Sequence, residues 1–349
     1  IMSNATIGIE KQVKAFCAQI GADPLLVQGA GGNVSWKDGD TLWVKASGTW
    51  LAEAELKNIF VPVNLSLLQA ALSKHDFSLE PEVTSCSELR PSIETVLHAL
   101  MPHRVVLHLH AVEILAHVVQ DNAKERIKNL IGNSVRWIYV DYFKPGAELA
   151  RAVSEKSTNT SDADVVFLGN HGVVIGGEDV KDVTSTLRAL TSKLQNKNSQ
   201  SVAEISIPTR ELEFLSRGYT LCSDKEVSLL ASKDELMNRL IHEWPIYPDH
   251  VVFLGAEPVI LEPNFRLLDL DEITSDKPPF IFACGEGVYE NLHVTGAQKS
   301  QLRCYYDVLS RQGASAKLTT LSDKQVSELL NWDAEKFRQN KTDNKLGAG

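Results

Sequence analysis

Residues 105–111 read VVLHLHA, an apolar stretch that contains two histidines. Side chains in a β-strand alternate between its two faces, so His108 and His110 would point to one side and the leucines to the other. Two imidazoles side by side are common ligands of a transition-metal ion. The pair alone is equally compatible with two core histidines that are hydrogen-bonded to backbone carbonyls. A metal site therefore needs a third ligand from elsewhere in the chain.

The composition is that of a globular protein with room for two domains. The chain has 349 residues, of which 43% are hydrophobic and 23% charged. Its net charge is −10, and because it has no basic tract we expect no nucleic-acid partner. Its five cysteines form no C-x-x-C pair, which favours a reducing cytoplasm over a disulfide framework. It has no run of about 18 apolar residues and no signal-peptide pattern, so we expect no membrane association.

Apolar spacing and turn residues predict an alternation of helices and strands in the first part of the chain. Helices are expected over residues 7–20, 58–74, 92–101, 112–120, 146–156 and 178–196. Strands are expected over TLWVKAS (41–47), VVLHLHA (105–111), RWIYV (136–140), DVVFLGN (164–170) and the following HGVVIGG.

The polar stretch NKNSQS at 196–201 predicts a boundary between two domains, residues 1–200 and 201–349. The second is expected to be a smaller α/β extension with a frayed tail and no assigned role. Helices are expected there over 224–243, 297–311 and 323–340, a strand over PDHVVFLG (248–255), and a strand–turn–strand unit over 278–290.

A third candidate ligand is His171, in the stretch LGNHGVVIGG. One strand ends at the polar N-H-G corner and another begins after it, which is a good position from which to reach a site. Catalytic zinc sites commonly use three protein ligands and leave one position open. His108, His110 and His171 could supply such a set, although His171 alone could equally be a turn histidine.

Glu94 is the candidate acid–base residue. It is expected in the first turn of the helix over 92–101, with Ser92 as the N-cap, directly before the histidine strand. A carboxylate beside a metal can remove a proton from a substrate whose carbonyl the metal polarises. A favourable charge at a helix N-terminus is the alternative. His98, one helical turn further on, could orient this carboxylate or could simply face the core.

Two loops of small residues flank the expected strand TLWVKAS. They read GGNVS (31–35) and ASGT (46–49), and their backbone amides and hydroxyls would suit a phosphate or a carboxylate. Ordinary turns are the alternative. The glycine-rich stretches GAGGNV (29–34) and GEGVYE (285–290) lack the final glycine of a dinucleotide-binding turn, so a nicotinamide cofactor is not expected.

Taken in order, G-N-V-S, A-S-G-T, S-I-E-x-x-x-H, H-L-H and N-H-G-V resemble the class II aldolase/adducin family over about residues 10–195. The resemblance implies an α/β fold, an α/β/α sandwich with a central, mostly antiparallel sheet. Sugar-phosphate aldolases of this family bind Zn²⁺, or another divalent transition metal, with three histidines. The matching ligands are His108, His110 and His171, and the matching catalytic residue is Glu94. The matching substrate- and phosphate-binding residues are Gly32, Asn33, Ser47, Gly48 and Ser92. Ile93 stands where the family has a second serine, which leaves the identity of the substrate open.

The implied activity is that of a metal-dependent lyase. It would cleave a ketose phosphate, or a similar hydroxy-ketone, by retro-aldol chemistry through a metal-stabilised enediolate. The alternatives are an epimerase or dehydratase of the same fold, or a non-catalytic, adducin-like interaction protein. The retained histidines argue against the adducin-like role, and a glutamate at position 94, where the pentulose-phosphate epimerases carry an aspartate, favours aldol cleavage.

The resemblance further implies a homo-oligomer, a tetramer, in which a neighbouring subunit contributes a residue to the site. The chain also looks like the aldolase part of two-part aldolase/short-chain dehydrogenase proteins.

Overall fold

A computed structural model describes residues 4–158, 163–196 and 210–331. Its first part is built on a seven-stranded sheet in the order β3-β2-β1-β4-β7-β6-β5. The strands are β1 (Asn33–Asp38), β2 (Thr41–Lys45), β3 (Phe60–Asn64), β4 (Val105–Leu109), β5 (Trp137–Val140), β6 (Val165–Leu168) and β7 (Gly172–Gly177). Neighbouring strands are antiparallel except β5 and β6, which are parallel. The predicted mostly antiparallel sheet is therefore confirmed.

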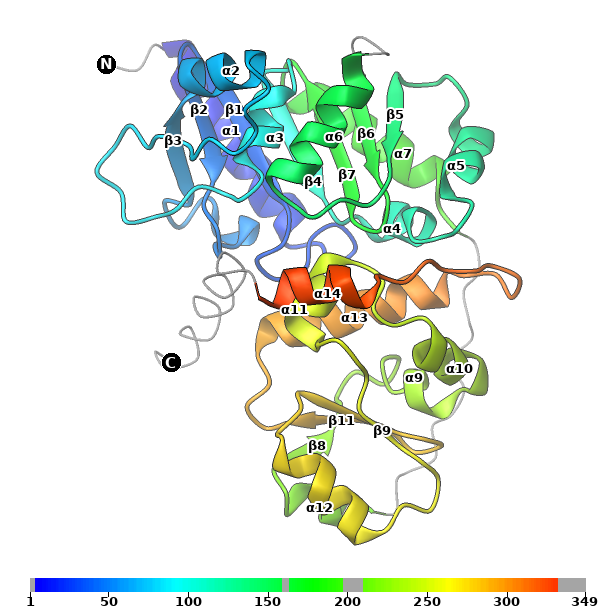
Figure 1. Cartoon of the computed structure of the whole chain (residues 1–349). Coiled ribbons are helices and arrows are strands. Elements are labelled where there is room, and N and C mark those ends of the chain that lie inside the picture. The colour runs from blue at the N-terminus through cyan, green and yellow to red at the C-terminus, as the bar shows by residue number, and fades with distance from the viewer. Residues whose placement is uncertain (1–3, 159–162, 197–209, 332–349) are drawn as a thin grey trace.

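Both faces of this sheet are covered by helices, because the strands carry apolar side chains on both sides. All five residues of β4 are buried; Leu107 belongs to one apolar core and Val106 to the other. The first core packs against α1 (Asn4–Gly21), α4 (Val112–Val118), α5 (Ala123–Ile131) and α7 (Val180–Lys193). The second packs against α2 (Leu65–Ser73), α3 (Thr95–Leu100) and α6 (Ala147–Thr158). This is the expected α/β/α sandwich (Figure 1).

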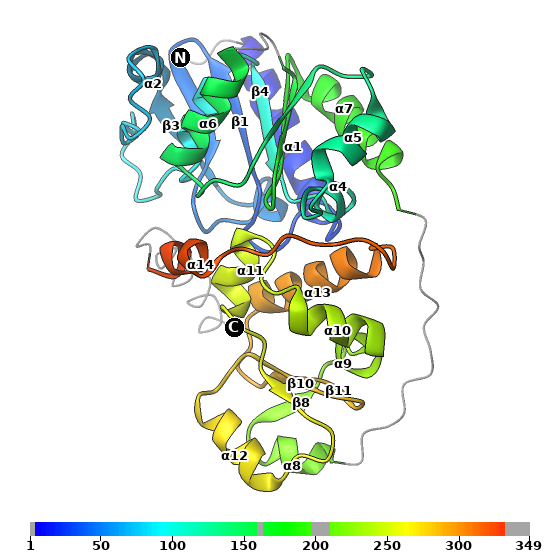
Figure 2. The same ribbon diagram turned by 45° about the vertical axis from the view of Figure 1, so that its right-hand side comes forward.

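The second part contains a four-stranded sheet in the order β8-β11-β10-β9. Its strands are β8 (Tyr219–Leu221), β9 (Ile260–Leu261), β10 (Phe280–Ala283) and β11 (Gly287–Asn291), and β10 and β11 form the predicted strand–turn–strand unit. The helices are α8 (Glu211–Leu215), α9 (Leu229–Ser232), α10 (Asp234–His242), α11 (Pro248–Leu254), α12 (Leu267–Ser275), α13 (Gly296–Ser310) and α14 (Asp323–Leu330). In both views α11, α13 and α14 lie between the two sheets (Figures 1 and 2).

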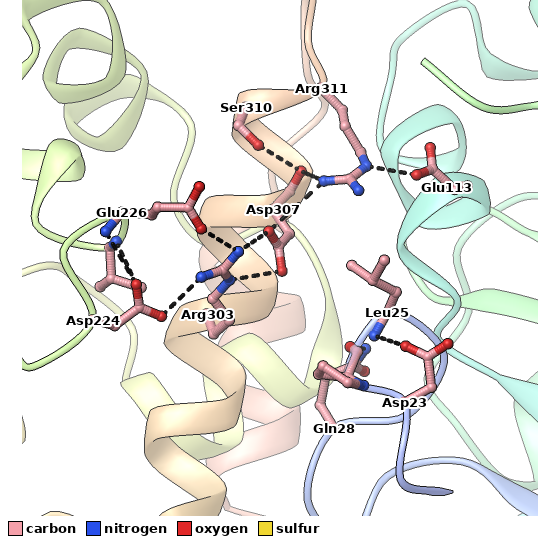
Figure 3. A network of polar contacts seen from close by, with 12 residues as sticks. Asp23, Leu25, Gln28, Glu113, Asp224, Glu226, Arg303, Asp307, Ser310 and Arg311 are labelled. Atoms are coloured by element: carbon pink, nitrogen blue, oxygen red, sulfur yellow. Dashed lines mark hydrogen bonds and ion pairs between the residues drawn. The ribbon is translucent and has the colours of Figure 1, made fainter. Parts of the chain in front are cut away.

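Polar contacts join α13 and the residues after it to the first part of the chain. Arg311 forms an ion pair of 2.9 Å with Glu113 of α4, as Figure 3 shows. Gln120 donates a hydrogen bond of 2.9 Å to Gln312. Earlier in α13, Arg303 pairs with Asp307 of the same helix at 3.0 Å and with Asp224 of the second part at 2.9 Å. The helix therefore has ion pairs to both parts of the chain.

The structure corrects the prediction of a strand over 248–255, which is the helix α11. Pro248 occupies the first helical turn, where its fixed φ suits a helix and its missing N–H costs nothing. All seven residues of α11 are buried. A short apolar run that is buried on every side has no periodicity that distinguishes a helix from a strand.

Two further expectations, a helix over residues 58–74 and an N-cap at Ser92, are also corrected. Residues 58–74 are not one helix but β3 followed by α2, and the side chain of Asn64 caps α2 by accepting a hydrogen bond of 3.1 Å from the N–H of Leu67. Ser92 is not the N-cap of α3, because its hydroxyl accepts from the N–H of Glu94 at 3.2 Å and Glu94 itself takes the N-cap position.

The boundary predicted at 196–201 and the frayed tail lie outside the described residues, apart from Asn196. The division into two domains stays a prediction. Among the described helices, none is long and apolar enough to cross a membrane.

Replacing Leu107 by alanine should lower the free energy of unfolding by about 2–5 kcal/mol, because the side chain is fully buried in the central strand. Urea denaturation measures the change. Leu56→Ala is the control: Leu56 is 84% exposed, and its loss should change stability by less than about 0.5 kcal/mol. Equal effects of the two substitutions would contradict the central position of β4.

Candidate metal and acid–base site

Strand pairing brings the three histidines together at one end of the large sheet. His108 lies in β4, His110 directly follows it, and His171 lies in the turn between β6 and β7. Because β4 pairs with β7, with His108 opposite Val174, the end of β4 lies beside the start of β7. All three imidazoles are buried, and their potential ligand atoms lie within 4.8 Å of one another.

In two of the rings, the contact made by Nδ1 determines how Nε2 is oriented. Nδ1 of His108 lies 3.2 Å from the carbonyl oxygen of Val173. A carbonyl can only accept, so Nδ1 carries the proton and Nε2 is left as a lone-pair donor. Nδ1 of His110 lies 3.3 Å from Oδ2 of Asp249, and its Nε2 faces Nε2 of His108 at 3.2 Å. This is the orientation that outer hydrogen bonds give to metal-binding histidines.

The carboxylate of Glu94 lies among these rings. Its Oε2 is 3.3 Å from Nε2 of His108 and its Oε1 is 3.5 Å from Nε2 of His171. Burial alone would raise the pKa of Glu94, but the His108 and His171 imidazoles and a hydrogen bond from Asn33 outweigh it and lower the pKa to about 2. Glu94 is therefore ionised at neutral pH.

Glu94 is held by a relay of three further side chains. The Asn33 amide donates to Oε2 of Glu94 at 3.0 Å, and Oδ1 of Asn33 contacts Nε2 of His98. An amide oxygen can only accept, so Nε2 of His98 carries the proton and its Nδ1 accepts from the hydroxyl of Ser35 at 2.7 Å. The sequence left open whether His98 orients the carboxylate or faces the core. In the structure it contacts Asn33, which in turn holds Glu94.

The two loops of small residues meet beside Glu94. The first precedes β1 and the second follows β2, and because β1 and β2 are antiparallel both loops reach the same end of the sheet. All five predicted substrate-binding residues line one cavity of about 40 Å³, together with Ile93, Glu94, His110 and His171. They are Gly32, Asn33, Ser47, Gly48 and Ser92. Gly32 and Gly48 have φ of 66° and 74°, a conformation that favours glycine.

Two charged lining residues of this cavity, Lys45 and Asp249, are absent from the predicted set. Lys45, the last residue of β2, is buried and donates to the carbonyls of Ala30 at 3.1 Å and Thr49 at 2.7 Å, so it links the two loops. The one feature of the sequence that could have pointed to Lys45 is its place at the end of an apolar, alternating strand. The second residue is Asp249, which the predicted strand over 248–255 concealed.

The corner that carries His171 is tied to the second part of the chain. Asn170 has φ of 50°, and its side-chain amide donates to the carbonyls of Ile246 at 2.9 Å and Thr319 at 2.6 Å. The position of His171 therefore depends on the segment that leads into α11 and on the residues before α14.

The residues present fit a divalent transition-metal ion. Burial lowers the pKa of His108 and lowers that of His171 to about 3, so both rings are neutral and can act as ligands. Oε1 of Glu94 is buried without a hydrogen-bond partner among the described residues. Three imidazole nitrogens beside an ionised carboxylate are a donor set typical of a catalytic site with an open position.

Comparison with known proteins matches the first half of the chain. The family model described as class II aldolase and adducin N-terminal domain matches residues 11–195. An uncharacterized oxidoreductase, YuxG, of Bacillus subtilis is 31% identical over 175 residues, which are 46% of this chain and 25% of that protein. This match thus covers only a quarter of that relative's length. An L-fuculose phosphate aldolase of Methanococcus maripaludis is 28% identical over 167 residues, 46% of this chain and 80% of that one.

A solved structure also matches this half. It is the N-terminal class II aldolase domain of a conserved protein from Thermoplasma acidophilum, with 26% identity and a TM-score of 0.46. The match covers 56% of this chain and 94% of that one.

The relay behind Glu94 predicts a loss of stability in acid. Burial lowers the pKa of His98 to about 3 from its ordinary 6.5. Between these values the unfolded chain binds a proton that the folded chain excludes, so stability falls as the pH is lowered from 6.5 toward 3, by up to about 1.4 kcal/mol per pH unit. His98→Gln should show a shallower fall in denaturation experiments across this range.

The matched control is His293→Gln, which replaces an exposed histidine and should keep the wild-type slope. If His98→Gln kept the wild-type slope as well, the inference that His98 is neutral in the folded protein would be wrong.

Proposed function

The chain belongs to the family of class II aldolase and adducin N-terminal domains, and we propose that it is a metal-dependent lyase that cleaves a ketose phosphate, or a similar hydroxy-ketone, by retro-aldol chemistry. One observation carries this proposal: the ionised carboxylate of Glu94 lies 3.3 and 3.5 Å from the imidazoles of His108 and His171. A carboxylate in that position could move a proton on a substrate whose carbonyl group an ion held by the histidines would polarise.

His108, His110 and His171 would hold the ion, Zn²⁺ or another divalent transition metal. When bound, the ion supplies Lewis-acid polarisation of a carbonyl group and neutralises negative charge on its oxygen. The chain's part is to keep the rings neutral and correctly turned. Burial keeps the rings of His108 and His171 neutral, and the acceptors beside Nδ1 of His108 and of His110 turn those two rings.

Glu94 is the proposed acid–base residue. When the carbon–carbon bond breaks, the hydroxyl of one fragment becomes an aldehyde and gives up its proton, while the carbon next to the carbonyl in the other fragment keeps the electron pair. Glu94, which is ionised at rest, would take up that proton, directly or through solvent, and deliver it to this carbon. In the direction of synthesis Glu94 removes that proton. The relay through Asn33 and His98 holds the carboxylate in place, so no reorientation is needed during the transfer.

The anionic end of the substrate would bind between the two loops. Gly32, Asn33, Ser47, Gly48 and Ser92 are the proposed contacts, and the buried ammonium of Lys45 adds a positive charge to the same cavity. The amide of Asn33 already serves Glu94, and the backbone N–H of Ser47 donates to the carbonyl of Arg90 at 2.9 Å. The hydroxyls of Ser47 and Ser92 are therefore the more important proposed groups.

The L-fuculose phosphate aldolases among the relatives support a sugar phosphate as the substrate class. We also propose a homo-oligomer, a tetramer, as the family resemblance implies. All five cysteines are free thiols, which supports a reducing compartment such as the cytoplasm.

His110→Ala should abolish metal binding, because it removes one of three ligands. Elemental analysis of protein purified without chelator should find about one ion per chain in the wild type and none in the variant. His117→Gln, at a buried histidine outside the ligand set, is the control and should keep the ion. An unchanged metal content in His110→Ala would remove His110 from the ligands, and no metal in the wild type even after reconstitution would favour the adducin-like role.

Glu94→Gln should keep the metal and lose proton exchange at the carbon next to the carbonyl, since a neutral amide cannot act as a base. Exchange of that hydrogen with deuterated water, followed by NMR on a panel of ketose phosphates, measures this step. Two fragments from one substrate would establish a lyase, whereas a product with the full carbon skeleton would establish the epimerase or dehydratase alternative. Full exchange in the variant would exclude Glu94 as the base.

A further inference from the structure

We propose that Asp249 of α11 is a positioning residue for the metal ligand His110, so that the part of the chain beyond residue 210 completes the metal site. This inference rests on the proposed function, because it assigns Asp249 a role toward the same ion. Residue 249 lies outside residues 11–195, which the family model matches. The acid is therefore an addition that this chain makes to the site from a distant segment.

The contact between the two side chains has the geometry that such a role requires. Oδ2 of Asp249 lies 3.3 Å from Nδ1 of His110, and both side chains are buried. A carboxylate only accepts, so it selects the form of His110 with the proton on Nδ1 and leaves Nε2 free of a proton. That Nε2 is the atom that faces Nε2 of His108 at 3.2 Å.

Asp249 is itself held in place by its surroundings. Gln301 of α13 donates to the same Oδ2 at 3.3 Å, and its side chain is fully buried. On the other side lies Gly31, where a Cβ atom would approach Oδ2 of Asp249 to 3.1 Å and the carbonyl oxygen of Gln28 to 2.8 Å. A side chain at position 31 would therefore push the carboxylate away from His110.

Further hydrogen bonds hold the chain around the ligands His110 and His171. The amide of Gln28 donates to the carbonyl oxygen of His110 at 3.3 Å. Asn170, next to His171, donates to Ile246 and Thr319. Ile246 is three residues before Asp249, so one segment contacts the ligand His110 and the neighbour of the ligand His171.

The expected consequence is tighter metal binding. A hydrogen bond to an anion makes the imidazole a stronger donor and restricts its rotation, and loss of such a partner typically weakens metal affinity by 10- to 100-fold, as an order of magnitude. A purely structural role for Asp249 would affect folding stability but not the affinity or the ligand field of the ion.

The test uses the full chain, freed of metal and titrated with Zn²⁺ against a competing chelator and with Co²⁺ by visible absorption. Asp249→Asn keeps the shape of the side chain and removes the charge. We expect it to weaken Zn²⁺ binding by about 10- to 100-fold and to shift the Co²⁺ bands. Glu290→Gln is the matched control, because Glu290 is also a buried acid of the second part, but it lies in β11 and pairs with Lys299 of α13. It should leave both readouts unchanged.

Gln301→Met is the second variant, should Asp249→Asn fail to fold. It keeps the carboxylate, removes the amide that holds it, and should weaken Zn²⁺ binding severalfold. Wild-type affinity and wild-type Co²⁺ bands in a folded Asp249→Asn would overturn the inference while leaving the three-histidine site intact. A wild type that binds Zn²⁺ but cleaves no ketose phosphate would refute the proposed lyase, and the affinity ratio would still decide the role of Asp249. A wild type that binds no metal would overturn both.

Discussion

The pairing of β4 with β1 on one side and β7 on the other is the constraint on which the site depends. In this register Asn33 lies opposite His108, and His108 lies opposite Val174. Side chains alternate along a strand, so a slip of one residue would turn His108 from the face of α3 to the opposite core. The same slip would bury Leu107 and Leu109 on the wrong side of the sheet. The apolar cores on both faces therefore protect the geometry of the histidines.

A buried carboxylate is the second constraint, because removing its charge from water is costly. In this protein the hydrogen bond that the Asn33 amide donates to Oε2 of Glu94 offsets part of that cost. The Asn33 amide contacts Glu94, and the proton on His98 determines which way that amide points. Every member of the relay is buried, so its proton positions are determined by internal partners and not by solvent. Such an arrangement is pre-organised for proton transfer.

The candidate site lies at the junction of the two parts of the chain, and both parts contribute residues to it. Helices α11 and α13 lie beyond one end of the large sheet (Figures 1 and 2), and the ion pair between Arg311 and Glu113 joins the end of α13 to α4 (Figure 3). Pro248 and Asp249 line the same cavity as Glu94 and the glycine-rich loop.

The sequence by itself determined the alternating α/β pattern, the histidine strand, His171 at its corner and Glu94 before the strand. These features are local: each is encoded in a few consecutive residues whose spacing has a physical meaning. The small residues of the two loops favoured an anion-binding site, and the resemblance to a family then indicated the mostly antiparallel sheet and the residues proposed to bind substrate. The sequence did not reveal that 248–255 is a helix, because the run VVFL is buried all round and shows no period.

Only the tertiary structure decided which residues meet. Asp249 reaches His110, Asn33 stands between His98 and Glu94, and Lys45 links the two loops. Each of these contacts joins segments that are far apart in the chain or in different elements, so the relative placement of sheets and helices creates it. No spacing along the chain encodes such a contact.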